Sequence, residues 1–337
     1  MKPMQTNRNL YIAIAIALVL GLGSIGAALF LRPPPAPLPI TVVQLQAPHS
    51  GLLQIAEAEG FFKQEGLDVN VKTAMTGHQA IAQVLDGVAD IGTAAYTPFA
   101  QALAQGKKPK LIATIFSSRW SSGVVVRKDR GILHPTDLAG KRIGFVSGTN
   151  THYDLETLLA FLGIPLESVT LVPGRPDELV SGMMSGNLDA ASIWIPFLTQ
   201  ITQAMGEQVT TFYPKEGYAE CFNIVVRQDY VATHPEEVAR LLRALVKAEN
   251  FALENPTQAT AIIAAASGVD VSALVGRSAA LAYELTLKQS LVIGTENQVR
   301  WIFRRGMVPD GPFPDVIGAI DTQPMRQIKP ESVTISR

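Results

Sequence analysis

The chain has 337 residues, of which 47% are hydrophobic and 17% charged, and its formal net charge at pH 7 is −1. A disordered chain combines low hydrophobicity with high net charge, so this composition excludes one. Cys221 is the only cysteine, which excludes a disulfide framework and a zinc site built from several thiolates. The near-neutral charge gives no reason to expect a nucleic-acid partner. The length favours about two domains.

Residues 10–31 form an apolar run without a charged side chain. As a helix this run spans about 33 Å, enough to cross a hydrocarbon core of about 30 Å. Lys2 and Arg8 precede it, which predicts a cytoplasmic N-terminus and export of the rest. We therefore expect residues 1–32 to be a membrane anchor. The alternative is a cleaved signal peptide, which would leave a secreted periplasmic form. Residues 33–39 are rich in proline and predict a semi-rigid linker.

Short apolar runs then alternate with helical patterns, which predicts an α/β fold with parallel sheets flanked by helices. The first predicted strands are 40–45, 68–72, 90–92 and 111–116, with helices at 51–63, at 79–85 and up to Leu103. The second set of strands is 142–146, 169–172, 189–193 and 208–212, with helices at 153–162 and 177–184. The last third predicts helices at 235–253, 259–266, 273–293 and 299–305.

One short segment occurs twice. Val125-Val126-Arg127-Lys128-Asp129 is echoed by Val225-Val226-Arg227-Gln228-Asp229. We interpret 124–127 and 224–227 as two strands that cross between two α/β lobes and form a hinge beside a cleft. Chance recurrence of a valine-rich strand is the alternative. The predicted first lobe comprises 40–127 and 221–337, and the predicted second lobe comprises 128–220.

Four stretches carry motifs in a characteristic order: 59–69, 87–92, 137–144 continuing to 148–153, and 186–191. In order and spacing they resemble the periplasmic solute-binding proteins of ABC importers, in the nitrate/sulfonate/taurine branch that shares a domain with thiamine-pyrimidine synthases. The resemblance implies a type-2 periplasmic-binding-protein fold, with two α/β lobes joined by two crossing strands. It also implies capture of a small anionic or organic solute, and delivery to an ABC permease at the periplasmic face of the inner membrane.

Two other functions stay open. One is an enzyme of thiamine-pyrimidine or other cofactor-precursor metabolism on the same fold, and the other is a ligand-sensing module for a signalling partner. The related pyrimidine synthases use a cysteine-rich motif and bound iron, and the lone Cys221 departs from that pattern. We expect no enzyme activity and no cofactor.

The candidate ligand contacts follow predicted strands, because ligands of open α/β sheets bind beyond the carboxyl ends of the strands. Gly148, Thr149, Asn150 and Thr151 stand between a strand and a helix, where free N–H groups and hydroxyls can hold an anion. The resemblance implies the same loop. Thr151 with Asp154 also fits a capping box, which needs no ligand.

The remaining candidates follow other predicted strands. Trp194 ends a strand, where it either covers a ligand or belongs to the core. Arg119 could neutralise an anion, although an arginine in a polar loop is more often solvated. The full set of predicted ligand-binding residues is Ser50, Thr93, Tyr96, Arg119, Gly148, Thr149, Asn150, Thr151, His152 and Trp194. No catalytic or metal-binding residue is predicted.

Overall fold

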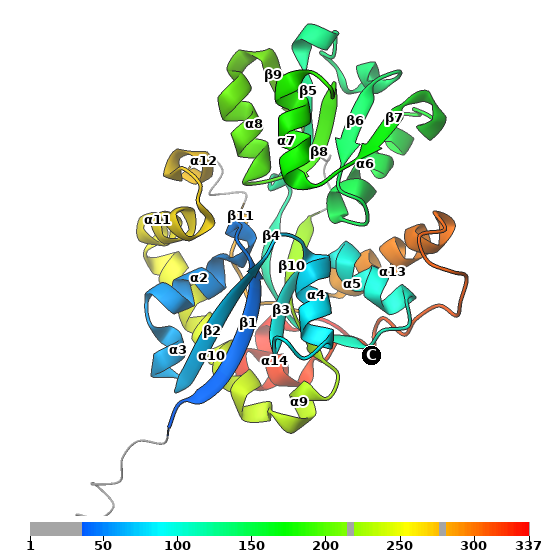
Figure 1. Cartoon of the computed structure of the whole chain (residues 1–337). Helices are drawn as coiled ribbons and strands as arrows, with labels where there is room; N and C mark the ends of the chain where they lie inside the picture. The colour runs from blue at the N-terminus through cyan, green and yellow to red at the C-terminus, as the bar shows by residue number, and fades with distance from the viewer. Residues whose placement is uncertain (1–35, 214–218, 276–280, 337) are drawn as a thin grey trace, which may run out of the picture. The chain divides into compact units, whose positions relative to one another are not determined.

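The computed structural model describes residues 36–213, 219–275 and 281–336 (Figure 1). The predicted anchor, residues 1–32, lies outside these residues, as does the first part of the predicted linker. Within the described ranges, no helix has the length and apolar character needed to span a membrane.

The first sheet, sheet A, has six strands in the order β11-β4-β10-β3-β1-β2. Their bounds are β1 Leu38–Leu45, β2 Leu67–Ala74, β3 Ile91–Ala95, β4 Pro109–Ser118, β10 Glu220–Arg227 and β11 Leu281–Ala282. β1 pairs in parallel with β2 and β3, whereas β10 lies antiparallel between β3 and β4. The start of β10 therefore lies at the same sheet edge as the end of β3.

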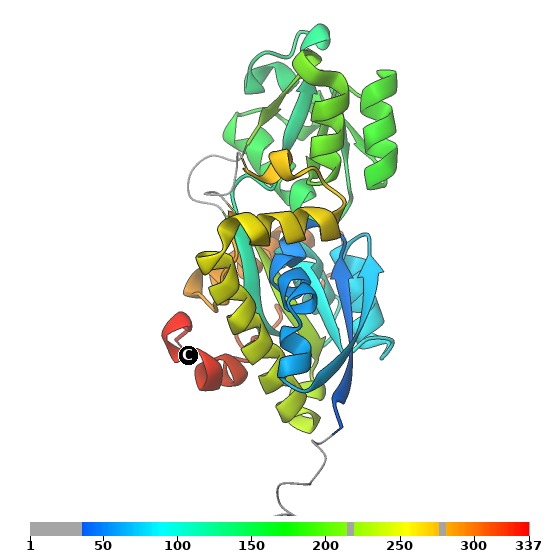
Figure 2. The ribbon, with the colours of Figure 1, turned by 90° about the vertical axis from the view of Figure 1, so that its left-hand side faces the viewer.

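Most helices belong to the lobe that contains sheet A. They are α2 Gly51–Ala58, α3 Phe61–Gln64, α4 Gly77–Leu85, α5 Tyr96–Ala104, α9 Tyr230–Thr233, α10 Pro235–Glu254, α11 Pro256–Ser267, α12 Val271–Val275, α13 Gln289–Arg304 and α14 Gln323–Ile328. Proline at the first position of α10 has no N–H to leave unpaired there. The apolar face predicted for α10 is buried, from Val238 to Ala248. Figure 2 shows α10 and α11 beside α2, which they contact.

The second sheet, sheet B, has five strands in the order β7-β6-β8-β5-β9. Their bounds are β5 Ser122–Arg127, β6 Arg142–Phe145, β7 Thr170–Pro173, β8 Ala190–Trp194 and β9 Val209–Phe212, and the helices are α6 Asn150–Phe161, α7 Pro176–Ser185 and α8 Phe197–Met205. Successive side chains of β5 face opposite sides of the sheet. Val124 and Val126 join a core with Leu155 of α6, whereas Val125 joins the other core with Leu198 of α8.

The repeated valine segment lies in equivalent strands of the two sheets. β5 pairs antiparallel with β8 in sheet B, and β10 pairs antiparallel with β3 in sheet A. The echo extends to an ion pair after each strand, Arg127–Asp129 at 2.7 Å and Arg227–Asp229 at 3.4 Å.

The predicted crossing positions are wrong, because the residues of 124–127 and 224–227 pair wholly within their own sheets. The chain instead passes from sheet A to sheet B at 119–121, and returns between β9 and β10. The strand at 122–127 thus belongs with the second lobe and Glu220 with the first, which corrects the predicted lobe boundaries.

Two further predictions differ from the structure, and one helix was not predicted. The helix predicted at 51–63 is interrupted at Gly60, whose φ of +71° suits glycine and ends the helical path. The single helix predicted at 273–293 is wrong, since α12 ends at Val275, Leu281 begins a short strand and α13 begins only at Gln289. Helix α8 was not predicted.

Candidate functional site

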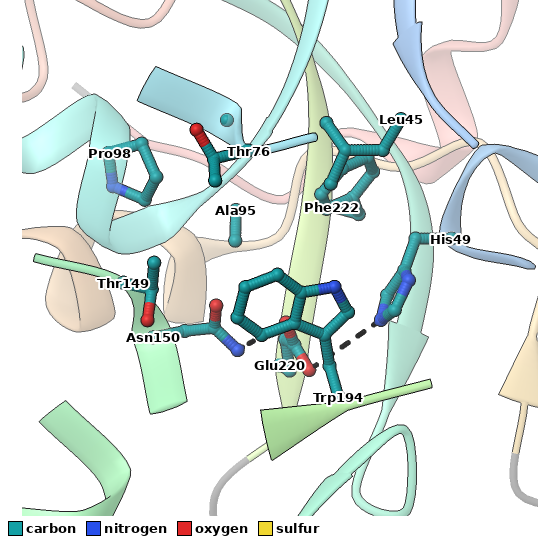
Figure 3. A pocket seen from close by; sticks show the side chains of 11 residues that line it. Leu45, His49, Thr76, Ala95, Pro98, Thr149, Asn150, Trp194, Glu220 and Phe222 are labelled. Atoms are coloured by element: carbon teal, nitrogen blue, oxygen red, sulfur yellow. Dashed lines mark hydrogen bonds and ion pairs between the residues drawn. The ribbon is translucent and has the colours of Figure 1, made fainter. Parts of the chain in front are cut away.

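A small cavity lies between the lobe of sheet A and the lobe of sheet B. Its lining residues come from both sheets and their helices (Figure 3): Leu45, His49, Thr76, Gly77, Ala95, Pro98, Thr149, Asn150, Trp194, Glu220 and Phe222. Its volume is about 20 Å³, little more than one water molecule needs. A larger solute can enter only if the walls contributed by the two sheets separate.

Glu220 is the buried carboxylate of this cavity, and three neutral donors hold it. Ser121 Oγ and Ser122 Oγ donate to its Oε2 at 2.8 and 3.2 Å, and Asn150 Nδ2 donates to its Oε1. Glu220 belongs to sheet A, whereas Ser122 begins β5 and Asn150 begins α6 on the side of sheet B. Burial raises the pKa of Glu220 to about 7, although the two serine hydrogen bonds oppose that rise.

His49 faces Glu220 with unused hydrogen-bonding capacity. It lies in a 3₁₀ turn, Pro48–Ser50. The centroid of its imidazole ring lies 5.0 Å from that of the Phe116 ring and 5.3 Å from that of the Phe222 ring. Both ring nitrogens are enclosed and have no hydrogen-bond partner. Burial lowers the pKa of His49 to about 3, so the ring is neutral at physiological pH. The 3.9 Å between its Nε2 and Glu220 Oε2 is therefore neither an ion pair nor a hydrogen bond.

Trp194 forms another wall. It is the last residue of β8, is 6% exposed and contacts the ring of Phe197 edge-on at 6.0 Å. In Figure 3 its indole is drawn between the side chains of Asn150 and His49. The position at the carboxyl end of a strand fits the predicted role as a cover, and the low exposure alone would also fit a core residue.

The loop before α6 reaches the cavity through two residues, Thr149 and Asn150. The Thr149 hydroxyl donates to the carbonyl of Val146 at 2.7 Å and lies 3.0 Å from the Thr151 hydroxyl. The alternative capping box is wrong, because Thr149 is the N-cap and Asp154 Oδ2 has no hydrogen-bond partner. The hydroxyls of this loop are thus engaged within the protein, and the Asn150 amide is the group that reaches across to sheet A.

The other predicted site residues lie outside the cavity lining. Ser50 is buried beside His49 with its hydroxyl unpartnered, and Thr93 accepts from the Leu45 N–H at 3.2 Å. Thr151 is fully buried, and its carbonyl accepts from Ser192 at 2.8 Å. Gly148 has a φ of +73° and packs against His78 and Gln101.

His152 belongs to a contact between α6 and α13 instead. Its Nε2 lies 3.1 Å from Glu156 Oε1, and the Trp301 indole donates to Glu156 Oε2 at 2.7 Å. Arg305 lies 3.0 Å from the same carboxylate. Burial acts to raise the pKa of Glu156, but the hydrogen bonds from His152 and Trp301 hold it below its usual value. We call these four residues the α6–α13 clasp, because they join the two lobes beside the cavity.

Tyr96 and Arg119 line a second cavity of about 390 Å³. Cys221 also lines it, and burial raises the pKa of this thiol to about 11. The Tyr96 hydroxyl donates to Cys221 Sγ at 2.9 Å. Because successive side chains of a strand face opposite ways, β10 separates this cavity from the one that Glu220 and Phe222 line.

Thr149, Asn150 and Trp194 of the predicted set line one cavity with His49 and Glu220, which are not in that set. His49 immediately precedes the predicted Ser50. Glu220 begins a strand, and the prediction considered only residues that follow strands. Among the described residues, no group of three or more His, Cys, Asp or Glu side chains is placed to hold a metal ion.

Comparisons with known proteins agree with this architecture. Residues 46–259 match the family described as NMT1/THI5 like. A protein of Brucella abortus named only as a binding protein is 29% identical over 226 residues, which cover 66% of this chain and 69% of that protein. The taurine-binding periplasmic protein of Escherichia coli is 27% identical over 207 residues, which cover 60% and 63%.

A solved structure has the same fold. The alkanesulfonate-binding protein SsuA from Xanthomonas axonopodis, bound to MOPS, superposes with a TM-score of 0.74. The match covers 86% of this chain and all of that one, at 17% sequence identity. The two-sheet periplasmic-binding-protein fold expected from the sequence is confirmed.

The buried Glu220 carboxylate predicts a pH-dependent stability. Its pKa is about 7 in the folded protein, above the ordinary 4.5. Folding therefore favours the protonated form, and the resulting stabilisation is complete below about pH 4.5 and lost as the pH rises through about 7. The difference in unfolding free energy between the wild type and Glu220→Gln should therefore change by about 3 kcal/mol, to the disadvantage of the wild type, as the pH rises from about 4.5 to about 7.

Urea denaturation at a series of pH values measures this difference. Glu296→Gln is the matched control, because Glu296 pairs with Arg300 at 3.0 Å on the outer side of α13. Its difference from the wild type should stay within about 0.5 kcal/mol. A wild-type difference from Glu220→Gln that does not change with pH would contradict the account.

Proposed function

Because the chain belongs to the NMT1/THI5-like family, we propose that it is the solute-binding component of an ABC importer. In this proposal it captures a small anionic or organic solute between the two lobes, outside the cytoplasm, and delivers it to a permease in the inner membrane. The relatives named above are binding proteins, one of them named as a taurine-binding periplasmic protein. They favour binding over the alternatives of catalysis and signalling.

The observation that carries the proposal is the composition of the cavity wall. His49 and Glu220 come from the side of sheet A, and Asn150 and Trp194 come from the side of sheet B. His49 is 2% exposed, yet neither ring nitrogen has a partner. An unpartnered buried polar group costs about 1–3 kcal/mol, so a solute that supplies the missing hydrogen bonds would be held firmly here.

Entry requires the lobes to part. The cavity of about 20 Å³ is too small for an organic solute. The Asn150–Glu220 hydrogen bond and the α6–α13 clasp both join the lobes. We expect these contacts to break when the cleft opens, and the lobes to close again on a bound solute, as in hinge closure.

For residues 1–32 we propose a membrane tether, on the strength of their uncharged apolar run. The Pro-rich segment 33–39 would then hold the binding domain away from the bilayer.

Cell fractionation tests the tether. The mature chain should be found in the membrane pellet, with residues 1–32 retained when its N-terminus is sequenced. A soluble chain whose N-terminus lies after about residue 28 would indicate signal-peptidase cleavage and contradict the tether.

Native mass spectrometry tests the binding function. Protein taken directly from cells should carry one small solute, and Trp194→Ala should lose it because the variant removes one wall of the cavity. Trp120→Ala is the matched control, since Trp120 is 45% exposed and does not line the cavity. Retention of the solute by Trp194→Ala, or its absence from the wild type at every preparation, would count against the proposal.

A further inference from the structure

The cavity that Glu220 lines is acidic where an anion site would be basic. Glu220 is a carboxylate in its wall, and neither lysine nor arginine occurs among the described residues that line it. The arginine that the sequence offered for an anion, Arg119, lines the second cavity on the other side of β10. A nitrate or a simple sulfonate would therefore meet a carboxylate here and find no opposite charge in the described wall.

The Glu220 carboxylate has room for one more donor. An ionised carboxylate offers about four lone-pair positions, and Ser121, Ser122 and Asn150 occupy three of them. All three donors are neutral, so they orient the carboxylate without supplying a counter-charge. The remaining position is on Oε1, because Ser121 and Ser122 both donate to Oε2. His49 Nε2 lies 3.9 Å from Oε2 and has no partner of its own.

A second buried carboxyl group lies near Glu220 and supplies no positive charge for an anion either. Asp154 lies in the first turns of α6, and its Oδ2 is enclosed without a hydrogen-bond partner. Burial and the nearby Glu220 raise its pKa well above the usual value. The neutral His49 ring offers one acceptor nitrogen as well as one donor. Trp194 presents an aromatic ring, which attracts cations.

We propose that the solute presents a positively charged or N–H-donating nitrogen group, an ammonium or amidinium, to Glu220 and His49 beneath Trp194. This inference rests on the proposed solute-binding function and narrows its substrate class. Solutes whose polar part is solely anionic are excluded by the same wall. A second, anionic group on the solute is compatible with the site if it lies away from Glu220.

Isothermal titration with matched pairs of probes tests the nitrogen group. The pairs are 2-aminoethanesulfonate with ethanesulfonate, and 4-aminopyrimidine with pyrimidine. In at least one pair the aminated member should bind about 10- to 150-fold more tightly than its partner, the range expected for a hydrogen bond to a charged group. Glu220→Gln should remove most of the preference for the aminated member. Glu284→Gln is the matched control and should keep the preference, because Glu284 lines two other cavities.

The pH dependence supplies a second readout. The titratable groups near Glu220 on its own side of β10 are His49, which stays neutral, and Asp154. On the opposite side of the strand they are Cys221 and Tyr96. As the pH rises from about 6 to 8, Glu220 loses its proton and an ammonium probe should bind about tenfold more tightly. Glu220→Gln should abolish this trend, and Asp154→Asn should preserve most of it.

The outcomes separate the inference from the proposed function. Equal binding of the two members of each pair, or unchanged affinity in folded Glu220→Gln, would overturn the inference while solute binding stands. So would a co-purifying solute whose elemental composition lacks nitrogen. Failure of all four probes, together with no co-purifying solute, would overturn both.

Discussion

The hydrogen-bonded carboxylate of Glu220 is the interaction on which the meeting of the two sheets depends. It stands on the first residue of β10 in sheet A, and its donors come from Ser121, Ser122 and Asn150 at the start of β5 and α6. Removing such a group from water is costly, which is why burial raises its pKa to about 7. The same residue thus connects the lobes and sets the electrostatic character of the cavity between them.

The two sheets reach this point by the same route. In the spatial order of each sheet, three parallel strands lie side by side, and the next strand is one that the chain enters from the other sheet. This strand is antiparallel to its neighbour: β10 lies beside β3 in sheet A, and β5 lies beside β8 in sheet B. The inserted strand begins where its parallel neighbour ends. Ser122 therefore lies opposite Trp194, and Phe222 opposite Ala95, at the edges that form the cavity. A site assembled in this way can open without unfolding either sheet.

Many elements of the fold were predictable because local patterns mark them, and the resemblance implied how they assemble. Apolar runs interrupted by glycine mark the strands and helices, and the repeated valine segment marks the two inserted strands. Asn150 and Trp194 were predictable because they follow parallel strands. Glu220 was not, because an antiparallel strand brings its first residue to the site, and strand direction is a property of the sheet. Likewise Arg119 is separated from the cavity by β10, which no local pattern reveals.

The central claim is that a solute binds between the lobes and contacts Glu220. A crystal structure of the protein with its co-purified solute tests this most directly. The account predicts the solute between Trp194 and His49, with a nitrogen atom within hydrogen-bonding distance of the Glu220 carboxylate. A solute found instead in the cavity behind β10, beside Arg119 and Tyr96, would contradict it.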